Sequence, residues 1–358
     1  MLKILRSFNL KIFLKLYLLI SARFFIDIRL IKEMSKRVKR RNTSLETAPE
    51  VDDIPSLIEI AQRRVRYLNL DAETLWKILP ELIQLNNMIG MKELKTTLFY
   101  QIVYYLQNMH KKGNNEYLHA VITGPPGTGK TSVAQIIGNI YKKMGILSSQ
   151  AKFTLAKRED FIAPYLGQTA IKTRMLLEQC VGGVLFIDEA YALGPGQKDK
   201  DSFSKEAIDT LNAFLSEHKN DFCCIIAGYE EDIERCFFRI NQGLARRFQW
   251  VHRITEYDSN ELALIMEKMI EEIKWEINMS TEELAEFIKE NKKYFKNFGG
   301  DIETFLSKCK MAHARRVFSL DERHRFVLLA EDLQQAKALL EQNQLDGDES
   351  EIPFGLYI

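Results

Sequence analysis

The feature that most constrains the fold of this chain is a glycine-rich segment, Gly124–Thr131 (GPPGTGKT). It fits the pattern G-x-x-x-x-G-K-[ST], in which glycines let successive backbone N–H groups curl around an anion. A short apolar run, Ala120–Thr123, precedes it, and a segment of helical character, Ser132–Tyr141, follows it. A strand, a phosphate-binding loop and a helix in this order predict a parallel α/β sheet with a phosphate at the helix N-terminus.

Each residue type in this loop has an expected role toward a nucleotide. Lys130 should reach the β- and γ-phosphates, and the hydroxyl of Thr131 should bind Mg²⁺. A glycine-rich turn that binds nothing is the alternative, which the flanking strand and helix disfavour. The residues predicted to surround the phosphates are Gly124, Pro125, Pro126, Gly127, Thr128, Gly129, Lys130, Thr131 and Ser132.

Two acidic residues follow a second apolar run further along the chain. Val184–Ile187 has the character of a buried central strand, and Asp188 and Glu189 come directly after it. Ligands of open α/β sheets bind at the carboxyl ends of the strands, which would place both carboxylates beside the phosphate loop. Asp188 is the expected carboxylate on the metal side, and Glu189 can polarise an attacking water as general base. The pair favours nucleotide hydrolysis over binding alone; a plain strand end is the alternative.

The rest of the pattern divides the chain into five regions. Residues 1–53 form a basic extension and linker, and residues 54–87 contain two short helical patterns, the second capped by Asp71. Residues 88–257 alternate between strand-length and helical segments, which predicts an α/β domain with a parallel five-stranded sheet between helices. Residues 258–343 indicate a small helical lid domain, and residues 344–358 a tail. The expected strands are 120–123, 152–155, 184–187, 223–227 and 250–254, and the expected lid helices are 259–273, 281–291, 301–317 and 330–343.

Charge is distributed unevenly along the chain. The 358 residues carry a net charge of +1, but residues 1–42 hold twelve Lys or Arg and two acids, so they carry +10 and the remainder −9. Residues 1–31 are apolar and basic, yet their longest charge-free run, Leu16–Ala22, is far shorter than the ~18 to 20 residues of a membrane span. An amphipathic helix at a membrane surface, a targeting segment and a solvated tail all fit this pattern, and Met34 is an alternative start.

The five cysteines form neither a C-x-x-C pair nor a cluster with histidine. Cys223 and Cys224 are neighbours in a predicted strand, so their side chains should point to opposite faces and a bond between them would be strained. Reduced thiols are therefore expected, in a cytosol-like or nuclear reducing compartment.

Five motifs, taken in order, resemble the CbxX/CfqX branch of the AAA+ ATPases, which includes the red-type Rubisco activases and the SpoVK-like sporulation proteins. They are GPPGTGKT, YLGQTAIKT, GGVLFIDEAYAL, IIAGYEEDI and NQGLARRF, and the resemblance covers roughly residues 85–317. It implies a P-loop AAA+ domain followed by a helical lid, an ATPase activity with ATP and Mg²⁺, and assembly into a ring that is hexameric by default.

The resemblance also implies roles for residues outside the phosphate loop. Ile89 and Gly90 match the turn that surrounds adenine. Arg247, next to Arg246, matches the arginine finger, which acts on the γ-phosphate bound by the adjacent subunit. Two basic residues on a solvated loop would be the alternative. ATP turnover that depends on such an arginine therefore requires an assembled ring.

A pore loop is implied between the second strand and the acidic pair. Tyr165, Leu166 and Gly167 match the aromatic–aliphatic–glycine loop with which AAA+ unfoldases grip polypeptide. A second pore loop would fall at residues 194–202. An aromatic side chain on a loop next to glycine can grip any polypeptide without reading its sequence; a buried tyrosine in an ordinary loop is the alternative.

Two positions depart from the family pattern. Tyr229 stands where an asparagine is usual at the end of the fourth strand, the sensor-1 position, although the sequence Ala-Gly-Tyr also occurs in this branch. Gly300 and Glu303 stand where arginines of the lid, at the sensor-2 position, are expected. The lid would then contribute no positive charge to the nucleotide, and residues 308–316, which are basic, are candidates for a substitute.

Three functional hypotheses follow from these features. The leading one is an ATP-driven ring that pulls client polypeptide through a central pore. The second is a nucleic-acid-dependent motor, which the basic cluster at residues 36–41 mildly favours. The third is a slow, nucleotide-gated scaffold held at a membrane by residues 1–31. Nothing outside the ATPase core indicates a specific client.

Overall fold

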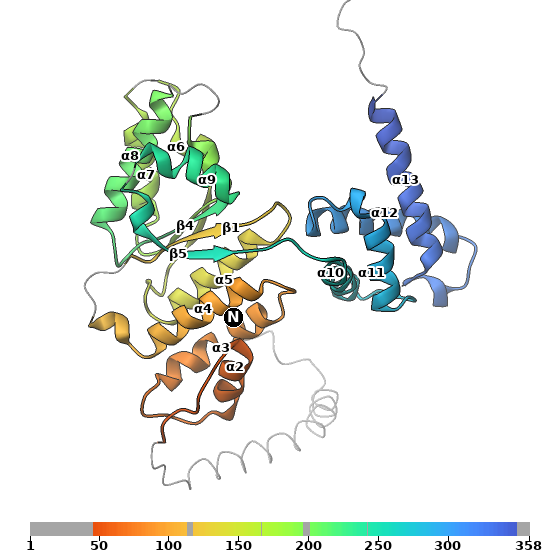
Figure 1. Cartoon of the computed structure of the whole chain (residues 1–358), viewed down its shortest axis with the longest axis horizontal. Helices are drawn as coiled ribbons and strands as arrows, with labels where there is room; N and C mark the ends of the chain where they lie inside the picture. Colours follow the sequence, from red (N-terminus) through yellow and green to blue (C-terminus); the bar gives the residue numbers. More distant parts are fainter. Residues whose placement is uncertain (1–45, 113–116, 166, 196–200, 242, 349–358) are drawn as a thin grey trace, which may run out of the picture. The chain divides into compact units, whose positions relative to one another are not determined.

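The computed structural model describes residues 46–112, 117–165, 167–195, 201–241 and 243–348, with side chains up to residue 342 (Figure 1). The described residues from Ala48 onward belong to one compact unit. The basic extension, its apolar segment and the cluster at residues 36–41 lie outside the described residues. Within the described part, no helix is long and apolar enough to cross a bilayer.

Five parallel strands form the central sheet, in the order β2-β3-β4-β1-β5. All five expected strands are present, and their ends differ by at most two residues from the prediction. The predicted parallel α/β sheet is thus confirmed. The strands are β1 (His119–Thr123), β2 (Phe153–Ala156), β3 (Val184–Ile187), β4 (Cys223–Gly228) and β5 (Phe248–Arg253).

Helices cover both faces of this sheet because parallel strands need crossover connections. Figure 1 shows α4 and α5 on one face and α6, α7 and α8 on the other. Strands β1, β3 and β4 are buried along their whole length between these two layers. The helices of this part are α2 (Ile54–Arg63), α3 (Ala72–Asn86), α4 (Lys92–Leu106), α5 (Lys130–Lys143), α6 (Arg158–Phe161), α7 (Thr169–Gln179), α8 (Ser202–Glu217) and α9 (Glu230–Cys236), with 3₁₀ turns η1 (Met109–Lys111), η2 (Ala190–Leu193), η3 (Phe238–Ile240) and η4 (Ala245–Arg247).

The adjacent cysteines of β4 show how the sheet separates two cores. Cys223 belongs to the apolar cluster on the α5 face and Cys224 to the cluster on the α8 face. All five cysteines are free thiols, as expected. Burial raises the pKa of the Cys223 and Cys224 thiols, so both stay neutral.

Two aspartates start the helices that precede the sheet. The side chain of Asp71 accepts the N–H of Thr74 at 3.1 Å, which confirms the predicted cap of α3. Asp53 accepts the N–H of Ser56 at 2.8 Å, and the Ser56 hydroxyl lies 3.1 Å from the Asp53 N–H in return. Each such cap contributes about 1 kcal/mol to helix stability.

The lid is helical as predicted but also contains a small parallel sheet. β6 (Glu276–Ile277) pairs with β7 (Val327–Leu328), an arrangement that no periodicity could reveal because each strand is only two residues long. The last helix continues to Asp348 instead of ending at residue 343, since one glycine costs only about 1 kcal/mol in a helix interior. The lid helices are α10 (Ser259–Glu272), α11 (Thr281–Glu290), α12 (Gly299–Val317) and α13 (Ala330–Asp348), with 3₁₀ turns η5 (Lys292–Tyr294) and η6 (Glu322–His324).

A buried polar cluster fastens this small sheet to α12 and α13. The carboxylate of Asp332 accepts hydrogen bonds from Arg316 Nε at 2.7 Å and from the N–H of Leu329 at 2.9 Å. His313 lies 3.1 Å from the same carboxylate and 3.0 Å from the carbonyl oxygen of Arg325. Burial alone would raise the pKa of Asp332, but these hydrogen bonds lower it, so the carboxylate stays charged.

A buried histidine on β5 makes the stability of the fold depend on pH. His252 is fully buried, and neither of its ring nitrogens has a hydrogen-bond partner among the described residues. Burial lowers its pKa from 6.5 to about 4. Below about pH 6.5 the unfolded chain therefore binds a proton that the folded chain does not bind. The stability that depends on neutral His252 is complete above that pH and is lost as the pH falls toward 4.

We expect His252→Leu to remove this part of the pH dependence. Between pH 7.5 and 5 the unmutated protein should lose roughly 2 kcal/mol more unfolding free energy than the variant, measured by urea unfolding at both pH values. Buried His119, whose pKa burial lowers to about 3, contributes equally to both proteins. Replacement of the exposed His324 by Gln is the control and should change nothing. Equal pH dependence of variant and unmutated protein would contradict this assignment.

Candidate active site

The phosphate-binding loop connects β1 to α5 at the carboxyl edge of the sheet. Gly129 is the N-cap of α5, and no side chain caps this end, so the first-turn N–H groups remain available to an anion. A hydrogen bond inside the loop helps to hold its shape, because Thr128 Oγ1 donates to the carbonyl oxygen of Pro125 at 2.8 Å.

Lys130 lies against the loop with its ammonium group near both acidic residues. Its Nζ donates to the carbonyl oxygens of Gly124 at 3.0 Å and Pro125 at 2.6 Å. Burial lowers the pKa of Lys130, whereas the charges of Asp188 and Glu189 raise it. The loop therefore holds a cation in the field of the two carboxylates, where a phosphate would meet it.

The two acidic residues turn away from the end of β3. Asp188 is half-buried and Glu189 is exposed. Glu189 has a left-handed backbone (φ 50°), which is uncommon for a residue with a side chain and costs of order 1 kcal/mol. The N–H of Glu189 donates to Asp188 Oδ1 at 3.1 Å, which helps to hold this turn.

One cavity of about 280 Å³ brings the predicted residues together. It joins residues of the glycine-rich loop with the carboxylates of Asp188 and Glu189, while the roles predicted for these carboxylates stay predictions. Its lining consists of Pro126, Gly127, Gly129, Lys130, Thr131, Asp188, Glu189, Tyr191, Gly228 and Tyr229. An ammonium group, loop amides, a hydroxyl and a carboxylate form a donor set that suits a phosphate-bearing ligand with a divalent cation.

The turn expected to surround adenine lies beside the phosphate loop. The methyl carbons of Met88 and Met91 are 3.6 and 3.5 Å from the position that a Cβ on Gly129 would take. Ile89 and Gly90, between these two methionines, are half-buried. The structure thus places the predicted adenine turn at the start of α5, although its role stays a prediction.

Two tyrosines face each other in the cavity. Tyr229, directly after β4, is 42% exposed, and its ring lies 6.2 Å from that of Tyr191. Burial and the charge of Glu189 raise the pKa of Tyr191, so its hydroxyl stays neutral. Sequence reasoning missed Tyr191, although it stands two residues after Glu189 in the GGVLFIDEAYAL motif.

A third tyrosine, also missed, lies between β5 and the lid. The hydroxyl of Tyr257 donates to the carbonyl oxygen of Thr128 in the phosphate loop at 3.0 Å. Burial, with a further contribution from Glu261, raises the pKa of Tyr257 to about 12, so it remains a donor. No sequence motif marks this residue, because its partner is 129 positions away.

The lid touches the phosphate loop through backbone where arginines are expected. The N–H of Gly299, the first residue of α12, donates to the carbonyl oxygen of Gly127 at 3.1 Å. The approach is so close that a Cβ on Gly127, where φ is +70°, would lie 1.9 Å from the carbonyl oxygen of Asn297. Gly300 and Glu303 follow on the same helix. The expected lack of a lid arginine at the nucleotide stays a prediction.

The predicted arginine finger is held by its own chain. Arg247 Nε donates to Ser216 Oγ at 2.7 Å, and Nη1 donates to the carbonyl oxygen of Gly243. Arg246 is exposed, whereas Arg247 is half-buried. Neither arginine lines the cavity of its own chain. The role of Arg247 stays a prediction.

The predicted pore loop presents its aromatic residue to solvent. Tyr165 is 69% exposed, and Gly167 (φ +77°) has no atom within 4 Å of where its Cβ would stand. At its base, the N–H of Ala163 donates to Thr169 Oγ1 at 3.2 Å. Leu166 of this loop lies outside the described residues. So do residues 196–200 of the second expected pore loop.

We expect Lys130→Ala to weaken nucleotide binding. Losing a charged hydrogen bond costs about 1.5–3 kcal/mol, which corresponds to a ten- to hundredfold higher Kd. Fluorescence titration with an ATP analogue measures this change. Lys142→Ala, at the other end of α5, is the matched control and should bind normally. Unchanged binding by Lys130→Ala would exclude this loop as the phosphate site.

Comparisons with known proteins agree with this geometry. Residues 120–254 match the family model of the ATPase family associated with various cellular activities (AAA). The fold resembles the FIGL-1 AAA domain solved in complex with ADP, with a TM-score of 0.53 at 17% identity over 73% of this chain and 87% of that one. At this identity the similarity concerns the fold alone.

Two relatives are closer in sequence. A cfxQ-like protein of Acanthamoeba polyphaga mimivirus, R730, is 38% identical over 274 residues, which are 76% of this chain and 67% of that protein. A CfxQ homolog of Pyropia yezoensis is 33% identical over 261 residues, 71% of this chain and 85% of that protein. With its phosphate loop, paired acids and helical lid, the chain belongs to the AAA family of ATPases, in the CbxX/CfqX-like branch.

Proposed function

We propose that this protein hydrolyses ATP with Mg²⁺ in an assembled ring and uses the energy to remodel client polypeptide. The observation that carries the proposal is the single cavity shared by Lys130, Asp188 and Glu189. A protein that only binds nucleotide has no need of a carboxylate at the position of Glu189. Membership of an ATPase family supports the same chemistry.

The polar groups of the cavity have different roles in the proposed reaction. The loop amides and Lys130 bind phosphate oxygens, while Thr131 and Asp188 are the residues that would hold Mg²⁺. The ion, when bound, offsets negative charge on the phosphates. Glu189 accepts a proton from water as the water oxygen attacks the γ-phosphorus, and the bond to ADP breaks. Tyr229 places a hydroxyl where AAA+ proteins usually have an asparagine, and this hydroxyl can orient the reacting groups.

The position of Arg247 supports the proposal of a ring, because this side chain does not line the cavity of its own chain. A cation that stabilises the transferring phosphoryl group can come from a neighbouring subunit, as an arginine finger does. The bonds to Ser216 and Gly243 hold Arg247 on one side of the chain. In a closed ring each subunit would complete the site of the next, which makes activity depend on assembly.

We expect specific ATPase activity to rise with protein concentration until the ring is assembled. Glu189→Gln should bind ATP but lose on the order of a hundredfold or more in turnover, as expected for loss of a general base. Arg247→Ala should lose a comparable factor because the phosphoryl transition state loses its cation. Steady-state phosphate release across a dilution series measures both effects.

Arg246→Ala is the matched control for the finger, because Arg246 is the exposed neighbour of Arg247 in the same turn. It should retain most activity. If activity is independent of concentration, or if Arg247→Ala is as active as Arg246→Ala, then the site works within one subunit and the ring mechanism is wrong.

The remodelling step is assigned to Tyr165 because its side chain is exposed on the predicted pore loop. We expect the unfolded protein casein to stimulate ATP turnover several-fold, and Tyr165→Ala to abolish this stimulation without changing basal turnover. Tyr165→Phe should keep it, since the aromatic ring provides the grip. Stimulation by a single-stranded oligonucleotide in place of casein would favour the nucleic-acid motor instead.

A further inference from the structure

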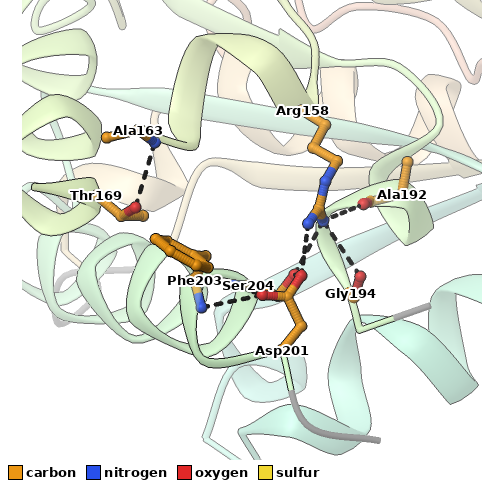
Figure 2. A network of polar contacts seen from close by, with 8 residues as sticks. All are labelled: Arg158, Ala163, Thr169, Ala192, Gly194, Asp201, Phe203 and Ser204. Atoms are coloured by element: carbon orange, nitrogen blue, oxygen red, sulfur yellow. Dashed lines mark hydrogen bonds and ion pairs between the residues drawn. The ribbon is translucent and has the colours of Figure 1, made fainter. Parts of the chain in front are cut away.

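Arg158 connects three segments that are far apart in the sequence. It is the first residue of α6, the helix that leads from β2 toward the predicted pore loop. Its guanidinium lies at the centre of the network in Figure 2. Nη1 donates to the carbonyl oxygens of Ala192 at 2.7 Å and Gly194 at 3.3 Å, and to Ser204 Oγ at 2.9 Å. Nη2 donates to Asp201 Oδ2 at 2.5 Å.

The first arm of this network reaches the turn that carries the general base. The N–H of Ala192 donates to the carbonyl oxygen of Glu189 at 2.7 Å, and the N–H of Gly194 donates to that of Tyr191 at 3.0 Å. Tyr191 and Glu189 both line the cavity. Gly194 is packed so closely on α9 that a Cβ there would lie 2.0 Å from the carbonyl oxygen of Cys236. Arg158 therefore holds the far end of the same short turn.

The second arm reaches the start of α8. Asp201 caps this helix, accepting the N–H groups of Phe203 at 3.0 Å and Ser204 at 3.3 Å. Burial raises the pKa of Asp201, but hydrogen bonds from Ser204 and Arg158 outweigh this and lower it. The charged carboxylate thus serves the helix cap and the guanidinium together.

The third arm is α6 itself. This helix is four residues long, too short to be stable through its own hydrogen bonds, so its position depends on what its side chains contact. Arg158 supplies such a contact at its first residue. Four residues after Phe161, the last residue of this helix, the chain reaches Tyr165, whose side chain is exposed.

The chemistry of the guanidinium suits this arrangement. It is planar and presents five N–H donors in a fixed fork, whereas a lysine ammonium is a single point of charge on a flexible stem. With four acceptor atoms around it, the guanidinium cannot keep its hydrogen bonds if one segment moves alone. A displacement of the Ala192–Gly194 backbone by about 1 Å would break bonds of normal length unless α6 and α8 followed.

We propose that Arg158 is a positioning residue that couples the nucleotide state of the Glu189 turn to the pore-loop helix α6 and to the start of α8. The coupling rests on the proposed function, because it requires the cavity to bind nucleotide. The turn senses the γ-phosphate through Glu189 and Tyr191, and the guanidinium passes its movement to both helices. One side chain thereby links the gripping of polypeptide at Tyr165 to ATP hydrolysis at Glu189.

Hydrogen exchange measured by mass spectrometry tests the coupling in the full chain. In a Glu189→Gln background, exchange is compared between saturating ATP and ADP for three segments: residues 124–132, 158–165 and 201–206. We expect all three to differ between nucleotides by about tenfold in exchange rate, a size typical of local opening equilibria. Adding Arg158→Lys should abolish the difference in the last two segments and leave it in the phosphate loop.

Two further variants separate coupling from loss of folding. Asp201→Asn keeps an N-cap residue but loses the charge that faces Arg158, so only the 201–206 response should disappear. Arg174→Lys, at a half-buried arginine of α7 that pairs with Glu178 and Glu217, is the matched control and should leave all responses intact. The melting temperature of each variant identifies any that fail to fold.

The outcomes distinguish the coupling from the proposed function. If Arg158→Lys and Asp201→Asn both fold and keep every response, Arg158 is structural and the proposal is overturned. It is also overturned if residues 158–165 and 201–206 never respond to nucleotide. Phosphate release by the protein with Glu189 intact is measured separately. Absent turnover would reject the proposed ATPase while the exchange data still decide the coupling.

Discussion

The parallel pairing of β3, β4 and β1 is the constraint on which the rest of the structure depends. Thr123 pairs with Gly228, and Ile187 pairs with Ile226, so the carboxyl ends of three strands meet at one edge. Each strand delivers a different group there: the phosphate loop after β1, the acidic pair after β3 and Tyr229 after β4. Because β1, β3 and β4 are buried along their whole length, a one-residue slip of β3 would draw the charged side chain of Asp188 into the buried sheet, so burial helps to fix the geometry of the site.

The two helical layers around the sheet carry different parts of the proposed machinery. On the α5 face, the helix that follows the phosphate loop packs into a core shared with α2, α3 and α4. On the opposite face, α6, α7 and α8 carry the predicted pore loop and the serine that holds Arg247. The candidate nucleotide site lies at the carboxyl edge of the sheet, between these layers, so a movement there can reach both.

Whether a feature of this structure could be predicted from the sequence depends on how far apart its interacting residues lie in the chain. The five strands and the cap at Asp71 were predictable because apolar runs and capping residues are local signals. The two-residue strands of the lid were not predictable, since they pair Glu276 with Val327 and Ile277 with Leu328, far apart in the sequence. Tyr257 and Arg158 were missed for the same reason, because their partners lie 34 to 129 positions away.

The class of fold and the residues of the candidate phosphate site could be predicted from local patterns, because the loop, its flanking strand and helix, and the acidic pair are each contiguous in the chain. How these groups are connected to the rest of the molecule depends on the folded structure. The backbone contact between Gly299 and Gly127, the bonds that hold Arg247 to α8 and the network around Arg158 arise from packing between distant segments. Such contacts leave no pattern in one sequence, since their geometry exists only once the sheet and its helices have assembled.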